Sequence, residues 1–146
     1  MFGSVPCKHN SKVELSRERR KGTRKVLPSN GEVQISLSLL EYERQLREEP
    51  AELRQSEIFS KIGEIVNSGE IYSLHIDVMR PPLIPNRSAF PIQLVREICE
   101  SFHGRILLEI HLMVTRPDHL VRQIDEFIKP ERRTRTSVII QREAYD

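Results

Sequence analysis

The chain has 146 residues, of which 38% are apolar and 30% charged, and its formal net charge is +2. This length fits one domain, and the composition is that of an ordinary soluble protein. No apolar run approaches the ~18 residues that a membrane span needs, and no signal peptide opens the sequence. Cys7 and Cys99 are too few for a disulfide framework, so the expected location is the reducing cytoplasm.

Residues 1–30 differ in composition from the rest of the chain. They hold eight basic residues against two acidic ones, few apolar residues, and several glycines and prolines that break regular structure. This composition predicts a disordered basic tail. Such tails can neutralise nucleic-acid phosphates, but here no aromatic side chain is interleaved with the basic cluster to stack on bases. We therefore expect a solvated tail rather than a nucleic-acid partner.

Strand and helix patterns alternate along the rest of the sequence. Apolar runs bounded by breakers predict strands at 33–40, 71–79, 106–114 and 137–141. Apolar residues at helical spacing predict helices within 41–67, which Pro50 divides in two, and at 91–102 and 118–128. The helical pattern before the second strand stops at Gly69, and residues 129–135 read as a charged connector. This alternation predicts an α/β fold with a parallel sheet and right-handed crossovers.

Polar residues occupy one face of the second and third predicted strands. Alternate residues of a strand point to the same face, so one strand presents His75, Asp77 and Met79 and the other Glu109, His111 and Met113. A buried parallel strand should be apolar on both faces. An isolated His or Asp in such a place is usually exposed or satisfied by a neighbour. Two imidazoles and a carboxylate on adjacent strands, however, also make most of a divalent-metal site.

The position of these residues favours a barrel over a nucleotide-binding fold. No glycine-rich phosphate loop follows the first predicted strand, which argues against a doubly wound nucleotide-binding sheet. The polar residues lie toward the strand ends that lead into helices, where a (βα) barrel carries its active site.

With the strands placed in this way, the sequence resembles the ribulose-phosphate 3-epimerase family, whose members are (βα)8 barrels. The resemblance rests on residues 73–79 (Ser-Leu-His-Ile-Asp-Val-Met) with Pro85-Asn86, and on residues 109–114 (Glu-Ile-His-Leu-Met-Val) with Arg116-Pro117. Residues 35–40 and 138–144 are similar to the family's first and fourth strands, although Gln141 stands where a His is usual. The resemblance covers residues 33–146 and only the N-terminal half of the family's barrel.

This resemblance implies a metal-dependent isomerase of the pentose phosphate pathway, which epimerises D-ribulose 5-phosphate to D-xylulose 5-phosphate at C3. The residues that match the family's ligands to zinc, iron, manganese or cobalt are His75, Asp77 and His111. Asp77 also matches one of the family's two acid/base carboxylates. The residues that match its substrate contacts are Ser38, Met79, His111 and Met113.

The sequence also departs from the family's pattern. Arg80-Pro81-Pro82 replaces an Asp-Gly, and the arginine would oppose a metal if it pointed inward or attract a phosphate if it did not. The family's second acid/base Asp and its phosphate-gripping loops lie on later strands. Four parallel strands cannot close a barrel, so residues 138–140 should form an exposed apolar edge.

We therefore expect a partial (βα)8 TIM barrel over residues 31–146, made of three strand–helix units and a fourth strand. Such a chain would epimerise poorly by itself and would need a homo-oligomer or a partner that supplies the missing half. The alternative is a truncated, non-catalytic half barrel that acts as an interaction module or remains as a remnant.

Overall fold

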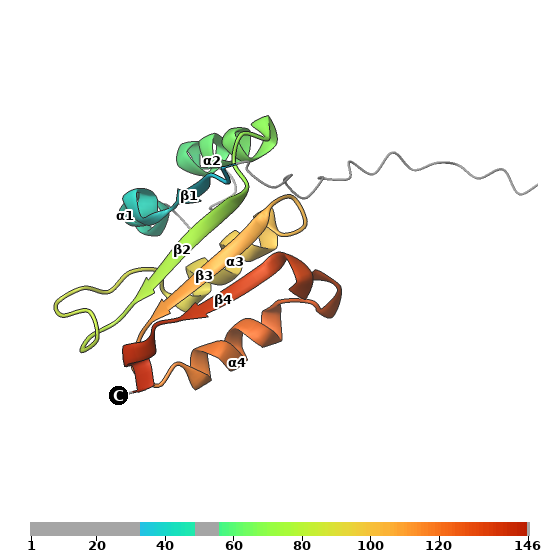
Figure 1. Cartoon of the computed structure of the whole chain (residues 1–146). Helices are drawn as coiled ribbons and strands as arrows, with labels where there is room; N and C mark the ends of the chain where they lie inside the picture. The colour runs from blue at the N-terminus through green and yellow to red at the C-terminus, as the bar shows by residue number, and fades with distance from the viewer. Residues whose placement is uncertain (1–32, 49–55, 146) are drawn as a thin grey trace, which may run out of the picture. The chain divides into compact units, whose positions relative to one another are not determined.

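The computed structural model describes residues 33–48 and 56–145, and its centre is a four-stranded parallel sheet (Figure 1). The strands lie in chain order, and they are β1 (Ser36–Ser38), β2 (Ser73–Met79), β3 (Leu107–Met113) and β4 (Thr136–Ile140). The helices are α1 (Glu43–Glu48), α2 (Glu57–Ser68), α3 (Ile92–Phe102) and α4 (Asp118–Phe127). The predicted parallel α/β arrangement is confirmed and is consistent with part of a TIM barrel. The predicted basic tail and Pro50 lie outside the described residues.

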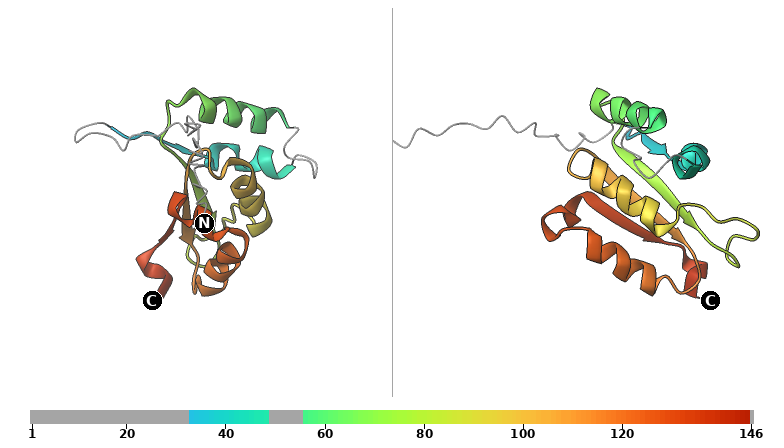
Figure 2. Two further views of the ribbon diagram at one scale, coloured as in Figure 1. Left: turned by 90° about the vertical axis from the view of Figure 1, so that its right-hand side faces the viewer. Right: turned by 180° about the vertical axis from the view of Figure 1, so that it is seen from behind.

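The helices form a layer on one face of the sheet, and no described helix covers the other face (Figures 1 and 2). The sheet residues on the helical side are the fully buried Leu74, Ile76, Val78, Leu108, Ile110 and Leu112. Their burial agrees with the predicted alternation, in which every second residue of these strands points to the same face. Each such side chain stabilises the fold by about 1.5–3 kcal/mol relative to its exposed state.

The ends of α2 follow from its sequence. The hydroxyl oxygen of Ser56 accepts a hydrogen bond from the Phe59 backbone N–H at 3.1 Å, which satisfies one of the free donors of the first turn. Gly69 ends the helix with φ at 78°, a left-handed conformation that residues with a Cβ rarely adopt. The predicted stop is therefore confirmed.

The other strands start and end within two residues of the predicted bounds, and two segments differ most from the sequence-based expectations. The first strand is shorter than the predicted 33–40, because regular pairing begins only at Ser36, opposite Ser73. Its neighbour Ile35 still accepts a backbone bond from Tyr72 at 2.7 Å. The predicted connector contains a 3₁₀ helix at Pro130–Arg135, since the proline presets the backbone of its first turn.

Both edges of the sheet expose apolar residues. Among the described residues, all the exposed large hydrophobic side chains lie on β4 or beside β1: Val33, Ile35, Val138, Ile139 and Ile140. The predicted apolar edge at 138–140 is therefore confirmed. No helix in the described part of the chain is both long and apolar enough to cross a membrane.

Candidate metal site

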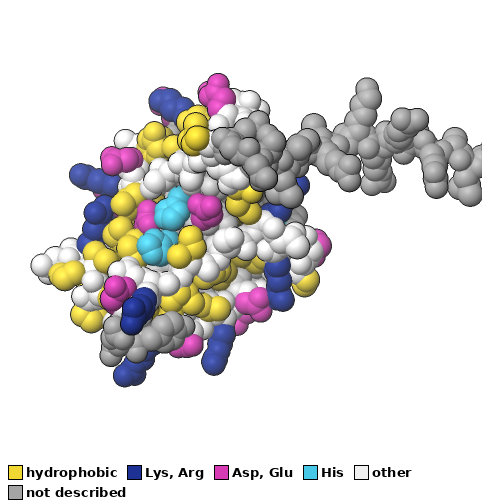
Figure 3. Space-filling view, in the orientation of Figure 1, with side chains coloured by type: hydrophobic (Ala, Val, Ile, Leu, Met, Phe, Trp, Pro, Cys, Tyr) yellow, Lys and Arg dark blue, Asp and Glu magenta, His cyan; other side chains and the backbone are white. Residues whose placement is uncertain are grey.

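The pairing of β2 with β3 brings the predicted metal ligands together. Asp77 is the register partner of His111, and His75 lies two residues before Asp77 on the same face of β2. This face is the side of the sheet without helices. Figure 3 shows histidine side chains meeting acidic ones at its centre, with hydrophobic side chains around them. Strand register alone therefore builds the cluster, and no loop is needed to assemble it.

The potential ligand atoms converge on one carboxylate oxygen. Asp77 Oδ1 lies 3.0 Å from His75 Nε2 and 3.4 Å from His111 Nδ1. The two imidazole rings stand edge to face, with centroids 5.7 Å apart and planes at 69°. One ligand atom from each residue falls within 4.8 Å of the others. This spacing is compact enough for all three to contact one ion.

The donor chemistry of the cluster fits a divalent cation. Asp77 is 9% exposed, and both histidines are half-buried. Within residues 33–48 and 56–145, no Lys or Arg forms an ion pair with Asp77. Two neutral imidazoles and one carboxylate carry a net negative charge, and this mixed set suits zinc, iron, manganese or cobalt. The residues present therefore fit the metal that the resemblance implies.

The residues predicted to contact a substrate surround this cluster. The Ser38 hydroxyl donates to Asp77 Oδ2 at 3.4 Å, which leaves Oδ1 turned toward the histidines. Met79 and Met113 are register partners at the ends of β2 and β3, and each is 8% exposed. They line the strand ends next to the cluster with apolar, polarisable surface.

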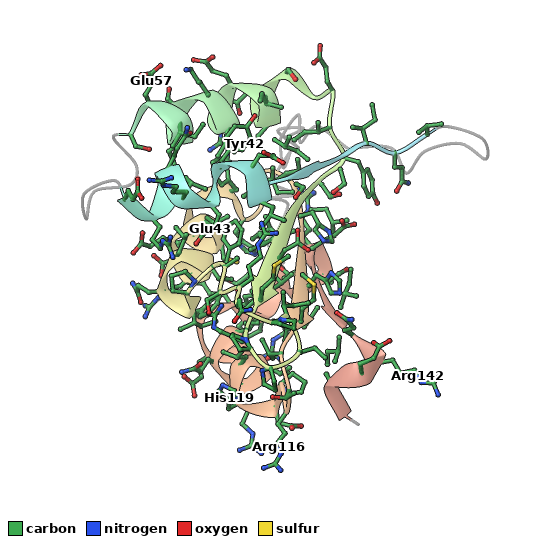
Figure 4. All side chains as sticks on the ribbon, turned by 90° about the vertical axis from the view of Figure 1, so that its left-hand side faces the viewer. Tyr42, Glu43, Glu57, Arg116, His119 and Arg142 are labelled. Carbon is green, nitrogen blue, oxygen red and sulfur yellow. The ribbon has the colours of Figure 1, made fainter. Side chains whose placement is uncertain are left out.

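Arg80 takes neither of the two orientations considered from the sequence. Its guanidinium donates to the carbonyl oxygens of Met79, Ala89 and Phe90, the last at 2.9 Å. Glu43, labelled in Figure 4, accepts the Phe90 backbone N–H at 3.3 Å. Burial lowers the pKa of Arg80, and the nearby Glu43 charge opposes that shift. The arginine therefore fastens the loop of residues 80–90 to the end of β2.

The Arg116-Pro117 motif forms the entrance to α4. Arg116 has φ at 51°, and its N–H donates to the Ala144 carbonyl at 3.1 Å. A ring nitrogen of His119 lies 3.2 Å from the Arg116 carbonyl, and both residues are labelled at the lower end of the view in Figure 4. The motif thus joins the end of β3 to the segment after β4.

Glu109 lies on the predicted polar face of β3, but the sequence pattern indicates no role for it. In the structure, Glu109 Oε2 lies 3.4 Å from His75 Nδ1 and accepts the Ser36 hydroxyl at 3.2 Å. Glu109 is also the register partner of His75. Its position two residues before His111 places Glu109 on the same face of β3. Its partner on β2 follows from the register of the two strands, which the sequence pattern does not give.

The fold and the cluster define a parallel α/β protein with a candidate metal site on an open strand face. The model of the ribulose-phosphate 3 epimerase family matches residues 53–139, more than half of the chain, and the chain belongs to this family. The match includes β2 and β3 with the whole cluster. None of the curated proteins and none of the solved structures compared with the chain gives a significant match. The family implies an epimerase-like function on sugar phosphates.

Proposed function

We propose that this chain carries the metal-binding half of an epimerase that inverts C3 of D-ribulose 5-phosphate to give D-xylulose 5-phosphate in the pentose phosphate pathway. The observation that supports the proposal most is the convergence of His75, Asp77 and His111 in a member of this family. Family membership favours the metal, which is zinc, iron, manganese or cobalt.

Asp77 is the acid/base group of the proposed reaction. A divalent ion held by His75, Asp77 and His111 would polarise the ketone and would stabilise the negative charge that develops on its oxygen. The Asp77 carboxylate takes the proton from the neighbouring carbon, which leaves an enediolate, and can return a proton to that carbon. The Ser38 hydroxyl holds Oδ2, 3.4 Å away, and so orients the carboxylate. Met79 and Met113 exclude water beside the reacting carbon.

Inversion needs a second acid on the opposite face of the enediolate. The cluster of His75, Asp77 and His111 in the described residues contains one carboxylate, that of Asp77. The minimum activity of this cluster is therefore exchange of the C3 proton with solvent, with the proton leaving and returning on one face. Net epimerisation requires a group that delivers a proton from the other face.

The first test is isothermal titration of the purified chain with zinc and with manganese. Stoichiometric binding is expected for the wild-type chain and loss of binding for a His75→Ala, His111→Ala double variant. His119→Ala is the matched control, because His119 is exposed and its partner among the described residues, the Arg116 carbonyl, lies at the start of α4. A folded wild-type chain that binds neither metal would refute the proposal.

The second test follows the carbon-bound proton. D-ribulose 5-phosphate is incubated in D₂O with the metal-loaded chain, and deuterium at C3 is measured by NMR. We expect incorporation that stops on chelation and in an Asp77→Asn variant. Tight metal binding without any incorporation would contradict the catalytic role of Asp77 and would favour the non-catalytic alternative.

The exposed sheet edges support a second proposal about assembly. We propose that residues 31–146 form the N-terminal half of a barrel, whose edges are covered by a second copy or by a complementary half barrel. The support is the confinement of exposed large hydrophobic side chains in the described residues to the two edge segments. The free thiol of Cys99 fits the cytoplasm as the proposed location.

Light scattering over a concentration series tests this proposal. Self-association that Ile139→Lys weakens would support a second copy, since Ile139 is 42% exposed on the edge strand. Ser137→Lys on the same strand is the control for added charge. Association without proton exchange would favour an interaction module. A monomer at all concentrations would refute the second copy and leave the complementary half barrel.

A further inference from the structure

We propose that the edge strand β4 binds the β1 segment of a second copy of this chain, so that two copies close an eight-stranded parallel barrel. This inference rests on the proposed function and deepens its assembly proposal, because it commits to one partner and one register. The observations that carry it are the direction of the two sheet edges, a groove beside β4, and an exposed isoleucine beside β1.

The two edges of the sheet are complementary in direction. All four strands are parallel and lie in chain order, so β1 and β4 are the edges and point the same way (Figure 1). A twofold axis along the strand direction would therefore set β4 of each copy beside β1 of the other as a further parallel pair. The seam forms twice, and no edge remains to template further association. Eight strands are also the number whose interior side chains just fill a barrel.

A groove lies beside the β4 edge on the helical side of the sheet. Its volume is about 240 Å³, and apolar side chains of α4 and β4 line it, among them Val121, Ile124 and Val138. Thr136 also lines it, and the buried Thr136 Oγ1 has no hydrogen-bond partner among the described residues. Buried hydroxyls are normally hydrogen-bonded. The groove therefore suits an occupant that brings both an apolar side chain and polar backbone groups, as an edge strand does.

The segment that leads into β1 offers the matching side chain. Ser36 and Ser38 lie on the open face of the sheet, where they contact Glu109 and Asp77. By the alternation of the strand, Ile35 lies on the helical side. Ile35 is 57% exposed. One edge thus presents an exposed isoleucine and the other an apolar groove, both on the helical side, so the β1 edge of a second copy fits the β4 edge.

Barrel geometry sets the register of this seam. Val138 is the register partner of Ile110, and Ile110 of Ile76, and this row continues to Leu39, one residue beyond the last pair of β1. Closing an eight-stranded barrel shifts such a row by a shear of about eight residues, of which each half contributes about four. A shift toward the C-terminus would set Val138 beside helix α1. The shift toward the N-terminus sets it beside Ile35 of the second copy, at the groove that Val138 lines.

Closure would complete the surroundings of the candidate metal site. The described helices all lie on one face of the sheet (Figure 2), so the face that carries His75, Asp77 and His111 becomes the barrel interior. Each copy then covers the open face of the other, and the two clusters share one interior. Exclusion of bulk water from this interior would strengthen the electrostatic interactions of a bound sugar phosphate.

Disulfide cross-linking between two single-cysteine variants tests the seam. Ile35→Cys and Val138→Cys are prepared in a Cys7→Ser chain, in which the remaining Cys99 is buried, and the two proteins are mixed, allowed to exchange and oxidised. Cysteines at register partners can form a disulfide, whereas those with Cα atoms more than about 7 Å apart cannot. We expect a covalent dimer in the mixture and almost none from either variant alone.

A matched control tests the register. Ile140→Cys replaces Val138→Cys in the mixture, since Ile140 is exposed to a similar extent on the same face of β4, two residues further on. Its yield of covalent dimer should be much lower. Equal yields from the two mixtures would overturn the register. Both substituted side chains are already exposed, so the variants should fold, and circular dichroism checks that they do.

Thr136→Val gives a second readout that a merely structural residue would not produce. The substitution keeps the shape of the side chain and removes the hydroxyl that lacks a partner in one copy. We expect the dissociation constant of the dimer, measured by analytical ultracentrifugation, to rise by about 3–10-fold, which is the loss of one net hydrogen bond. The dilute monomer should be as stable as the wild-type chain or more so. An unchanged dissociation constant would contradict the seam.

The outcomes separate this inference from the proposed function. A covalent dimer from Val138→Cys alone would show two β4 strands paired with each other, and assemblies beyond two copies would show pairing that does not close. Either result overturns the two-copy barrel, as does a monomer at every concentration. Zinc titration of the wild-type chain decides the metal site independently. A monomer that binds zinc overturns only this inference, and a cross-linked dimer that binds neither zinc nor manganese overturns the metal site and keeps the seam.

Discussion

Replacing the partly buried Arg80 by alanine should destabilise the fold more than replacing an exposed arginine. Its guanidinium donates to the backbone carbonyl oxygens of Met79, Ala89 and Phe90. Ala89 and Phe90 are buried, at 3% and 0% exposure. Truncation removes a donor from each of these carbonyls and takes away the partner of the Phe90 oxygen where water has little access, and a buried polar group left without its hydrogen bond is destabilising.

The expected magnitude follows from these contacts. A hydrogen bond to a charged group contributes about 1.5–3 kcal/mol, and the carbonyls of Met79 and Ala89 keep a second bond within the backbone bridge between them. We therefore expect a total loss of about 2–4 kcal/mol in the free energy of unfolding. For a domain of this size that corresponds to a melting temperature lower by roughly 7–17 °C.

Urea unfolding followed by circular dichroism measures this loss. Arg87→Ala is the control, because Arg87 lies in the same loop but is exposed, and it should change stability by less than about 0.5 kcal/mol. Arg80→Lys should recover little, since one ammonium group cannot reproduce the guanidinium fork. Equal stability of Arg80→Ala and Arg87→Ala would refute the account of Arg80 as the fastening of the loop.

Further predictions concern α2 and the buried thiol. Ser56→Ala should cost about 1 kcal/mol in thermal unfolding, while Ser60→Ala, on the exposed side of the same helix, should cost far less. Burial raises the pKa of Cys99 to about 12. In a Cys7→Ser chain, iodoacetamide at pH 8 should modify the folded protein about a thousandfold more slowly than the urea-unfolded chain. Because the folded pKa is raised, Cys99 should also make stability fall as pH rises above about 9, and Cys99→Ala should remove that slope. Rapid labelling of the folded chain would contradict its burial.

The sequence alone predicts the elements whose structure depends on residues close together in the chain. The alternation of Leu74, Ile76 and Val78 predicts a strand with one buried face, and all three are fully buried. Gly69 marks the end of α2 for an equally local reason, because the left-handed backbone there favours glycine. The candidate ligands could be placed on one face by the same period of two.

The remaining features depend on how segments far apart in the sequence pair and pack. That Glu109 lies opposite His75 follows from the register of β3 against β2, which the separate strands do not encode. Arg80 could have pointed inward or outward, and its actual partners come from the path of the loop up to Phe90. The length of β1 depends likewise on where its partner strand begins to pair.

The register of β2 against β3 has a consequence for folding. If β3 slipped by one residue, His111 would turn to the helical side, and an aliphatic side chain would face Asp77 instead. A cation held by His75, Asp77 and His111 would therefore stabilise only the correctly aligned strands. At a free concentration 100 times its dissociation constant, that preference amounts to about 2.7 kcal/mol. Metal binding would then favour the native register of β2 and β3 over shifted registers during folding.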